Sequence, residues 1–189
     1  MTRRVEQLQK EFEVGIRWTA FPLHPETPPE GRTLEDLFAG RPINIDEMLS
    51  HMKNVAEGLG LPFGNREKTY NSRMAQELGK WAESLGKGDE FHHAIFRAYF
   101  ADGRNIGNIS TLIDVGGTLG LPESDIRDVL ETQAYKSDVD SDWARAYEMG
   151  ITAVPSFMMN QQVVVGAQPY NVLVNFMESN QVPRRSTDQ

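Results

Sequence analysis

The spacing of apolar residues changes four times along the chain, alternating between a helical period and a strand period. Near the N-terminus Val5, Leu8 and Phe12 recur every three or four positions, which predicts a short amphipathic helix. In residues 14–21, "VGIRWTAF", apolar and polar positions alternate, and Pro22 ends the run. Alternation with a period of two predicts a half-buried strand over residues 14–21.

Between residues 33 and 150 the apolar spacing is almost entirely helical. Asn44 followed by Glu47 has the pattern of a capping box and predicts the start of a helix. Five apolar stripes follow, made of Met48, Leu49, Met52 and Val55; Met74, Leu78, Trp81 and Leu85; Phe91, Ile95, Phe96 and Tyr99; Leu112, Val115 and Leu119; and Ile126, Val129 and Leu130. A last stripe over residues 143–149 ends at Gly150, the residue type that most often follows a helix.

After Gly150 the period returns to two. Residues 156–159 and 162–165 are separated only by Asn160 and Gln161, which predicts a β-hairpin with a two-residue turn. Pro169 is suited to the first helical position, and the apolar residues behind it predict a final amphipathic helix, at Val172, Leu173, Phe176 and Met177.

The predicted order is helix, strand, helical block, strand, strand, helix. Because the helical block interrupts an α/β pattern, it is expected to be an inserted subdomain rather than a second independent domain. We expect a discontinuous domain of residues 1–30 and 150–182, an insertion of residues 31–149 and a flexible tail of residues 183–189.

The composition of the chain limits the classes of binding partner that we expect. The formal net charge of −8 over 189 residues argues against nucleic acid and anionic membranes, which select basic surfaces. No stretch approaches the roughly 20 consecutive apolar residues of a spanning helix, and "MTRRVEQLQK" lacks the apolar centre of a secretory signal. We therefore expect a cytoplasmic chain with no nucleic-acid partner and no membrane partner.

The sequence contains no cysteine. This excludes a disulfide framework, a thiolate zinc site and a thiol nucleophile supplied by these 189 residues. The histidines do not replace them as metal ligands, because His92 and His93 diverge by about 100° on a helix. We expect no metal and no cofactor.

Two further patterns are interpreted as packing. Gly116, Gly117 and Gly120 lie within a helical stripe and follow no strand, so they favour close helix packing over a phosphate-binding loop. The aromatic residues between positions 91 and 100 are interpreted as core, and two arginines near them as solvent-facing; they are Phe91, Phe96, Tyr99 and Phe100, with Arg97 and Arg104.

The dipeptide Val154-Pro155 stands directly before an expected strand and allows two interpretations. A trans proline is tolerated as the first residue of a strand, since it cannot donate to the sheet. A cis proline would instead make a sharp bend, at a cost of roughly 0.5–1 kcal/mol for an X-Pro bond.

The stretch "GITAVPSFMMNQQVVVGAQPYNVLVNFM" resembles the C-terminal signature of DsbA-like thioredoxin-fold proteins of the FrnE type. The stretches "FRAYFADGRNIGNISTLIDVGGTLGLP" and "IRWTAFPLHPETPPEG" are similar to the same branch, so the resemblance runs through nearly the whole chain. It implies an α/β thioredoxin-like fold with a large all-helical insertion, and a cis proline at Pro155.

The resemblance also implies a Cys-x-x-Cys pair at the start of the first helix, preceded by a central strand. In this sequence that strand and its redox motif would lie before the first predicted helix, so the first central strand is missing from the fold we expect. A central gap leaves backbone groups without partners. We expect that the chain starts upstream of Met1; alternatively, the flanking strands pair with each other, or a homodimer forms through the open sheet edge.

By resemblance, Val154 and Pro155 are candidate substrate-binding residues, because backbone at this bend pairs with an extended substrate. Asn71 is a further substrate-binding candidate at the mouth of the helical block; its alternative role is to cap the next helix. No catalytic residue is expected within the chain.

Three functions remain open. The first is a thiol-disulfide oxidoreductase of the DsbA/FrnE type whose redox cysteines are absent from this chain, acting on a thiol- or disulfide-containing protein or a small thiol. The second is a redox-inactive thioredoxin-like module that binds a peptide or has a structural role. The third is a relative of glutathione-dependent isomerases, which share the inserted fold. In each case the 189 residues alone are expected to be inactive in disulfide exchange.

Overall fold

A computed structural model describes residues 2–186 of the chain. The chain divides into two compact units, Met1–Leu23 with Trp143–Gln189 and His24–Asp142. Helix α8, Lys136–Glu148, contributes residues to both. No described helix is long and apolar enough to cross a membrane.

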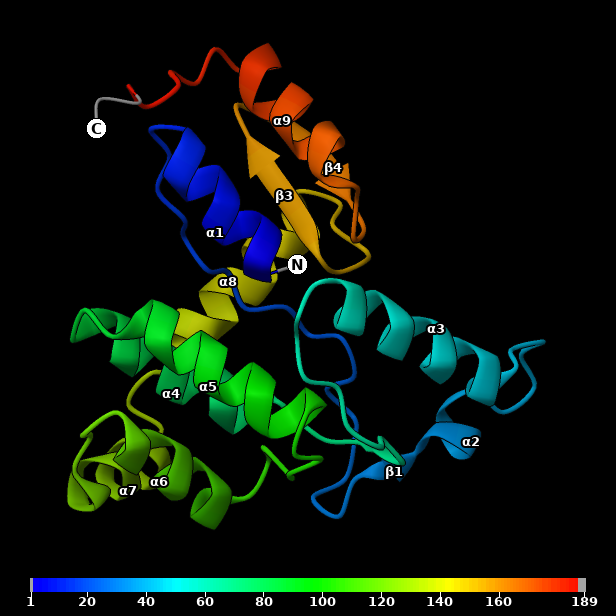
Figure 1. Ribbon diagram of the computed structural model, residues 1–189. Helices are drawn as coiled ribbons and strands as arrows, with labels where there is room; N and C mark the ends of the chain where they lie inside the picture. The colour runs from blue at the N-terminus through cyan, green and yellow to red at the C-terminus, as the bar shows by residue number, and fades with distance from the viewer. Residues whose placement is uncertain (1, 187–189) are drawn as a thin grey trace. The chain divides into compact units, whose positions relative to one another are not determined.

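The first unit is built on a hairpin packed against two helices. Strands β3, Ser156–Met159, and β4, Gln162–Val165, lie beside α1, Thr2–Glu11, and α9, Tyr170–Ser179 (Figure 1). The core between them is apolar and consists of Leu8, Phe12, Leu173, Phe176 and Met177, with Phe157, Met159 and Val164 packed against it. Burial of these side chains is what holds a two-stranded hairpin in place, because such a hairpin is marginally stable alone.

The turn between β3 and β4 confirms the predicted hairpin. Asn160 and Gln161 both have positive φ, 48° and 66°, as a type I′ turn requires. In the resulting register Phe157 pairs with Val164, and both pack against the core. The neighbouring pair, Met158 with Val163, therefore faces away from the core.

The predicted strand over residues 14–21 is wrong. These residues have no regular secondary structure, although their apolar positions are half-buried and their polar positions exposed in strict alternation until Ala20. The described strands pair only as β1 with β2 and as β3 with β4. A period of two in apolar residues indicates which side chains are turned toward the core. A strand also needs a neighbouring backbone with which it can form hydrogen bonds.

Residues 183–186, the described part of the predicted tail, have contacts with the end of α1. Arg184 forms an isolated antiparallel bridge with Phe12, and its guanidinium lies 4.7 Å from the centre of the Phe12 ring. The amide of Glu13 donates to the carbonyl of Pro183 at 2.8 Å. Residues 183–186 are thus tied to the end of α1, and residues 187–189 lie outside the described residues.

The second unit is mainly helical. Its helices are α2, Leu34–Leu37; α3, Ile45–Gly58; α4, Arg73–Ser84; α5, Gly88–Phe100; α6, Ile109–Thr118; and α7, Glu123–Glu131. A small antiparallel sheet joins β1, Arg32–Thr33, to β2, Lys68–Thr69. The five predicted apolar stripes fall on α3 to α7, and the core lies between α4, α5, α6 and α7 around Leu78, Phe91, Leu112 and Ile126.

The ends of the helices agree closely with the sequence patterns. The side chain of Asn44 accepts the amide of Glu47 at 3.2 Å, as the capping pattern predicts. Pro169 is the N-cap of α9 instead of its first helical residue, a difference of one position. In α3 the apolar stripe is not buried, and Val55 is 40% exposed.

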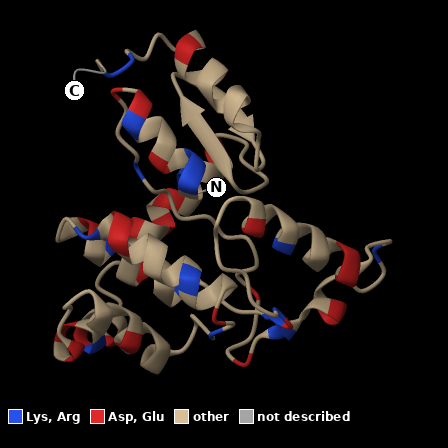
Figure 2. Ribbon diagram, in the orientation of Figure 1, with Lys and Arg blue, Asp and Glu red and all other residues tan. Residues whose placement is uncertain are grey.

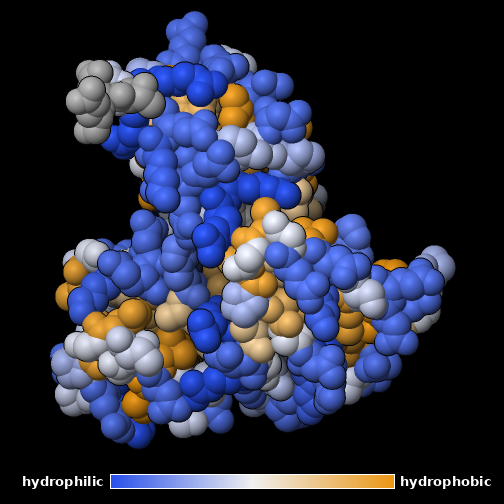
Figure 3. All heavy atoms as spheres, in the orientation of Figure 1, coloured by the Kyte–Doolittle hydropathy of each residue, from blue (hydrophilic) through white to orange (hydrophobic). Residues whose placement is uncertain are grey.

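Charged residues of both signs are spread along the helices, α1 included (Figure 2). Figure 3 shows a face on which hydrophilic residues predominate and hydrophobic residues appear between them. This mixture is ordinary for a folded protein, because polar side chains do not suffice to cover the whole surface.

Adjacent glycines of α6 have opposite surroundings. A Cβ at Gly116 would lie 2.5 Å from Cδ1 of the fully buried Ile126, whereas a Cβ at Gly117 would meet nothing within 4 Å. The expected close packing thus holds at Gly116, where α6 approaches α7.

We predict that Gly117→Ala stabilises the protein by about 0.5–1 kcal/mol, since alanine is the better helix former. Gly116→Ala should destabilise it, because overpacking costs about 1–3 kcal/mol, more than the gain in propensity. Urea denaturation of the two variants measures both effects. Equal stability of the two variants would contradict the close approach of α6 to α7.

Candidate functional site

Val154 and Pro155 lie in the loop between α8 and β3. Their peptide bond is cis. The loop is fastened on both sides: the amide of Ile151 donates to the carbonyl of Ala146 at 2.9 Å, and the hydroxyl of Ser156 donates to the carbonyl of Ala153 at 2.7 Å. The side chain of Val154 is nevertheless 44% exposed, so a fixed backbone presents an apolar side chain to solvent.

Strand β3 is paired along one edge only. The amide of Gly166 donates to the carbonyl of Pro155 at 2.7 Å, and the ladder continues through Phe157 and Met159 toward β4. Because antiparallel bonds alternate, the N–H and C=O groups of Ser156 and Met158 point to the opposite edge. Within residues 2–186 no strand lies on that edge, and no hydrogen bond reaches the backbone of Val154.

The outward face beside this edge is apolar. Met158 and Val163 form a cross-strand pair and are 37% and 39% exposed, and Val165, opposite Ser156, is 48% exposed. We call the backbone edge at Val154, Ser156 and Met158, together with the side chains of Val154 and Met158, the β3 edge site. It offers main-chain donors and acceptors next to apolar side chains, which suits an extended polypeptide. It contains no titratable side chain and no nucleophile other than the Ser156 hydroxyl.

Asn71 belongs to the second unit, where its side chain is fully engaged. Its amide nitrogen donates to the carbonyls of Pro25 at 2.9 Å and Thr27 at 3.2 Å, and its amide oxygen accepts the N–H of Arg73 at 2.9 Å. These bonds hold the loop before β1 against the start of α4. Ser72 is the N-cap of α4 but makes no side-chain capping bond, so Asn71 satisfies the first turn in its place.

A cluster of paired charges on α4 was not predicted from the sequence. Arg73 contacts the buried Glu77 at 2.6 Å and Asp140 at 2.6 Å, and Lys80 contacts the buried Asp142 at 2.7 Å. Burial lowers the pKa of Arg73, but its hydrogen bonds to Glu77 and Asp140 outweigh burial and raise the pKa overall. The spacing of Arg73 and Glu77 is the only local signal; their partners on α8 lie more than 60 residues away. Because each cation meets an anion, the cluster serves to join α4 to α8.

The pKa of His92 lies below its ordinary value. Burial lowers its pKa, and the carboxylate of Glu83, 3.4 Å from Nε2, opposes that shift only in part. The next residue, His93, is exposed. Over residues 2–186 no group of three or more histidine, aspartate or glutamate side chains is placed to hold a metal ion.

We predict that stability falls in mildly acidic solution partly because of His92. The folded-state pKa lies below 6.5, so as the pH falls through 6.5 the unfolded chain binds this proton first and the free energy of unfolding decreases. His92→Gln should therefore lose less stability than the parent between about pH 7 and about pH 5. Chemical denaturation at several pH values measures this, with His93→Gln as the matched control. A parent-like pH dependence of His92→Gln would contradict the prediction.

Comparison with known proteins places this geometry in a family. The uncharacterized protein YwbO of Bacillus subtilis (strain 168) is 28% identical over 179 residues, covering 93% of this chain and 87% of YwbO. The crystal structure of a probable DsbA oxidoreductase from Streptomyces coelicolor superimposes with a TM-score of 0.85 at 23% identity, covering 95% of this chain and 82% of that one. A 2-hydroxychromene-2-carboxylate isomerase structure gives a TM-score of 0.74 at 19% identity, over 94% and 85% of the two chains.

These structures confirm the expected thioredoxin-like fold with a helical insertion. The model of the DSBA-like thioredoxin domain matches residues 1–178. Since that match spans nearly all of the 189 residues, this chain belongs to the family of DSBA-like thioredoxin domains.

Proposed function

We propose that this chain binds an extended polypeptide along the β3 edge site and serves as the substrate-binding part of DsbA-type thiol-disulfide exchange. The observation that carries the proposal is the backbone of Val154, Ser156 and Met158, which faces an edge that no described strand occupies. Family membership and the likeness to a probable DsbA oxidoreductase support the same class of substrate, a protein that bears thiols or disulfides.

The geometry favours recognition through the main chain. An added strand pairs with every second residue of an edge, so residues 154–158 accommodate roughly five residues of substrate. Side chains of that strand on the outward face would meet Met158, while those on the other face would turn toward the core. The preferred substrate is therefore an unfolded segment with an apolar residue at alternate positions.

The chemical step needs a thiolate that attacks a disulfide sulfur. The 189 residues contain no cysteine and therefore supply no thiol. In this proposal their role is to bind the substrate. This proposal combines two of the three functions that the sequence left open, a DsbA-type exchange protein and a peptide-binding module. We also propose that the chain belongs to the FrnE-type branch and works in the cytoplasm, as the resemblance of "VVVGAQP" to that branch suggests.

We predict that a labelled, unfolded apolar peptide with one cysteine binds the protein and that its Cys→Ser form binds with the same affinity, because recognition is through the main chain. N-methylation at alternate peptide residues, in the register that faces β3, should weaken binding by about tenfold or more through the loss of two hydrogen bonds. N-methylation in the other register should have little effect. Fluorescence anisotropy measures all four affinities.

A pair of protein variants locates the bound peptide. Met158→Lys, on β3, should weaken binding, whereas Val163→Lys, on the same face but on β4, should not. Their similar exposure makes the pair a matched test of position. Binding that is indifferent to N-methylation and to both lysines would contradict the proposed edge pairing. Sedimentation velocity shows whether a second copy of the chain occupies the edge instead.

We predict that the purified 189-residue chain does not accelerate the reduction of insulin disulfides by dithiothreitol, because it has no thiolate to form a mixed disulfide. The turbidity of precipitating insulin chains measures the rate, with a buffer blank as the control. If a sample without titratable thiols reduces insulin faster than the blank, the chain does more than bind its substrate and the prediction is wrong.

A further inference from the structure

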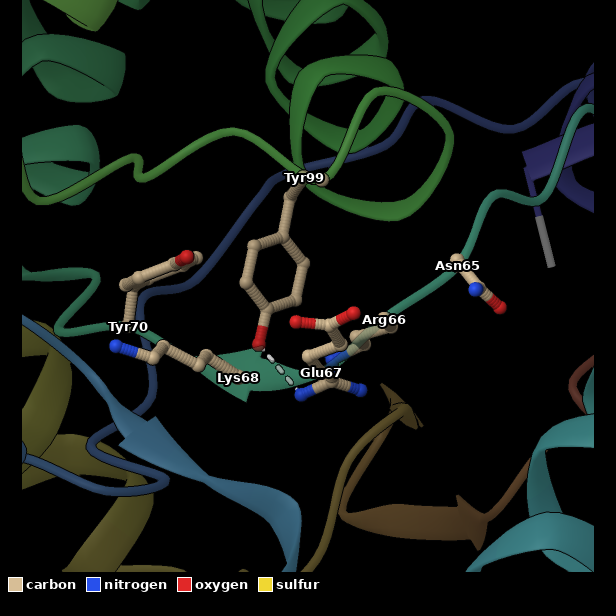
Figure 4. A pocket seen from close by; sticks show the side chains of 7 residues that line it. Asn65, Arg66, Glu67, Lys68, Tyr70 and Tyr99 are labelled. Carbon is tan, nitrogen blue, oxygen red and sulfur yellow. Dashed lines mark hydrogen bonds between the residues drawn. The ribbon is translucent and has the colours of Figure 1, made fainter.

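A cavity of about 190 Å³ lies in the second unit. It is lined by residues 65–68 and Tyr70, which surround β2, and by Tyr99 and Gly103 at the end of α5. Figure 4 shows the Tyr99 ring standing above the guanidinium of Arg66, with Lys68 and Tyr70 to one side. Two cations, Arg66 and Lys68, and one carboxylate, Glu67, thus line one small cavity.

The backbone that carries Arg66 is held in place on both sides. Before it, the amide of Gly64 donates to the carbonyl of Phe100 at 2.9 Å. A Cβ at Gly64 would lie 2.0 Å from the carbonyl oxygen of Ala101, so only glycine allows this close approach. After it, Lys68 pairs with Thr33 in the small sheet. The position of Arg66 is therefore set by the fold and not by a mobile loop.

The guanidinium of Arg66 is oriented but lacks an anion. Its central carbon lies 4.7 Å from the ring centre of Tyr99 and 5.7 Å from that of Phe100. One N–H group donates to the Tyr99 hydroxyl, which in turn lies 3.1 Å from the hydroxyl of Thr69. The buried Nε has no hydrogen-bond partner among the described residues.

A buried N–H group without a hydrogen-bond partner reduces the stability of the folded protein. A guanidinium has five N–H groups in total, so it needs several acceptors. Among the described residues Arg66 forms no ion pair, and Glu67, the one carboxylate that lines the cavity, is exposed to solvent. Among the described residues the second cation, Lys68, donates only to the carbonyl of Glu30, at 3.4 Å. Arg66 and Lys68 therefore leave an excess of hydrogen-bond donors and positive charge in the cavity.

We propose that this cavity binds a small organic carboxylate through the guanidinium of Arg66. A planar carboxylate accepts two parallel N–H bonds from one guanidinium, and Lys68 adds a second attractive charge. The aromatic rings of Tyr70 and Tyr99 provide walls for the organic part of the ligand. The volume is close to that of an apolar cavity known to take up benzene, about 150 Å³, and below the roughly 300 Å³ of drug-sized sites.

The test uses the Arg Nε–H signals in proton–nitrogen NMR spectra of the full chain. Benzoate, succinate and inorganic phosphate are titrated separately, each against sodium chloride at equal ionic strength. We expect a saturable shift of the Arg66 signal with benzoate or succinate and none with chloride. A response to phosphate alone, or an equal response to chloride, would overturn the proposal.

Matched variants assign the binding to the pocket. Arg66→Gln should weaken carboxylate binding by about tenfold or more, since a charged hydrogen-bonding group is lost. Arg97→Gln removes the same charge from an exposed position on α5 and should leave the affinity within about twofold. Lys68→Gln keeps Arg66 in place and should weaken binding by a few-fold, so it tests the site if Arg66→Gln folds poorly. Equal losses in Arg66→Gln and Arg97→Gln would show a general charge effect and reject the site.

Discussion

The hydrogen bonding of β3 on one side only is the constraint on which the first unit depends. Its inner face is buried against α1 and α9, and its ladder to β4 occupies one edge. The same register that buries Phe157 turns Met158 outward and directs every second backbone group of β3 to the other edge. The register that stabilises the hairpin thus directs these backbone groups to an edge that no described strand occupies. Unpaired edges are the places where other chains add strands.

In the second unit the main constraint is the burial of charged side chains. Glu77 and Asp142 are buried and paired with Arg73 and Lys80, so their desolvation is offset by direct contacts. Arg66 is the exception, because its stacking on Tyr99 and its single hydrogen bond do not satisfy all its donors. Arg73 therefore has a structural role, whereas Arg66 keeps unsatisfied donors, which is why we propose that it binds a ligand.

Local patterns made much of the fold predictable. The hairpin follows from Asn160 and Gln161, and the helices follow from apolar stripes and from the cap at Asn44, all of which act within a few residues. The failures involve distant partners. Residues 14–21 alternate as a strand would, yet pairing depends on a backbone that local sequence does not specify. The pocket at Arg66 was missed for the same reason, since it requires Gly64 to meet Ala101, 37 residues later in the chain. Val154 and Pro155 were found through family resemblance, not through periodicity.

The chain lacks cysteine but has an open edge on β3. These two features are compatible because peptide recognition and disulfide exchange have different physical requirements. Exchange depends on the pKa and access of one thiolate, so it is lost entirely with that sulfur. Strand addition depends on backbone N–H and C=O groups, which every residue but proline provides, and on the packing that holds them at an edge. In this chain the core formed by Leu8, Phe176 and Met177 provides that packing without any contribution from a redox motif. The open edge of β3, where we propose that a peptide binds, therefore follows from the packing of the fold and does not require a thiol.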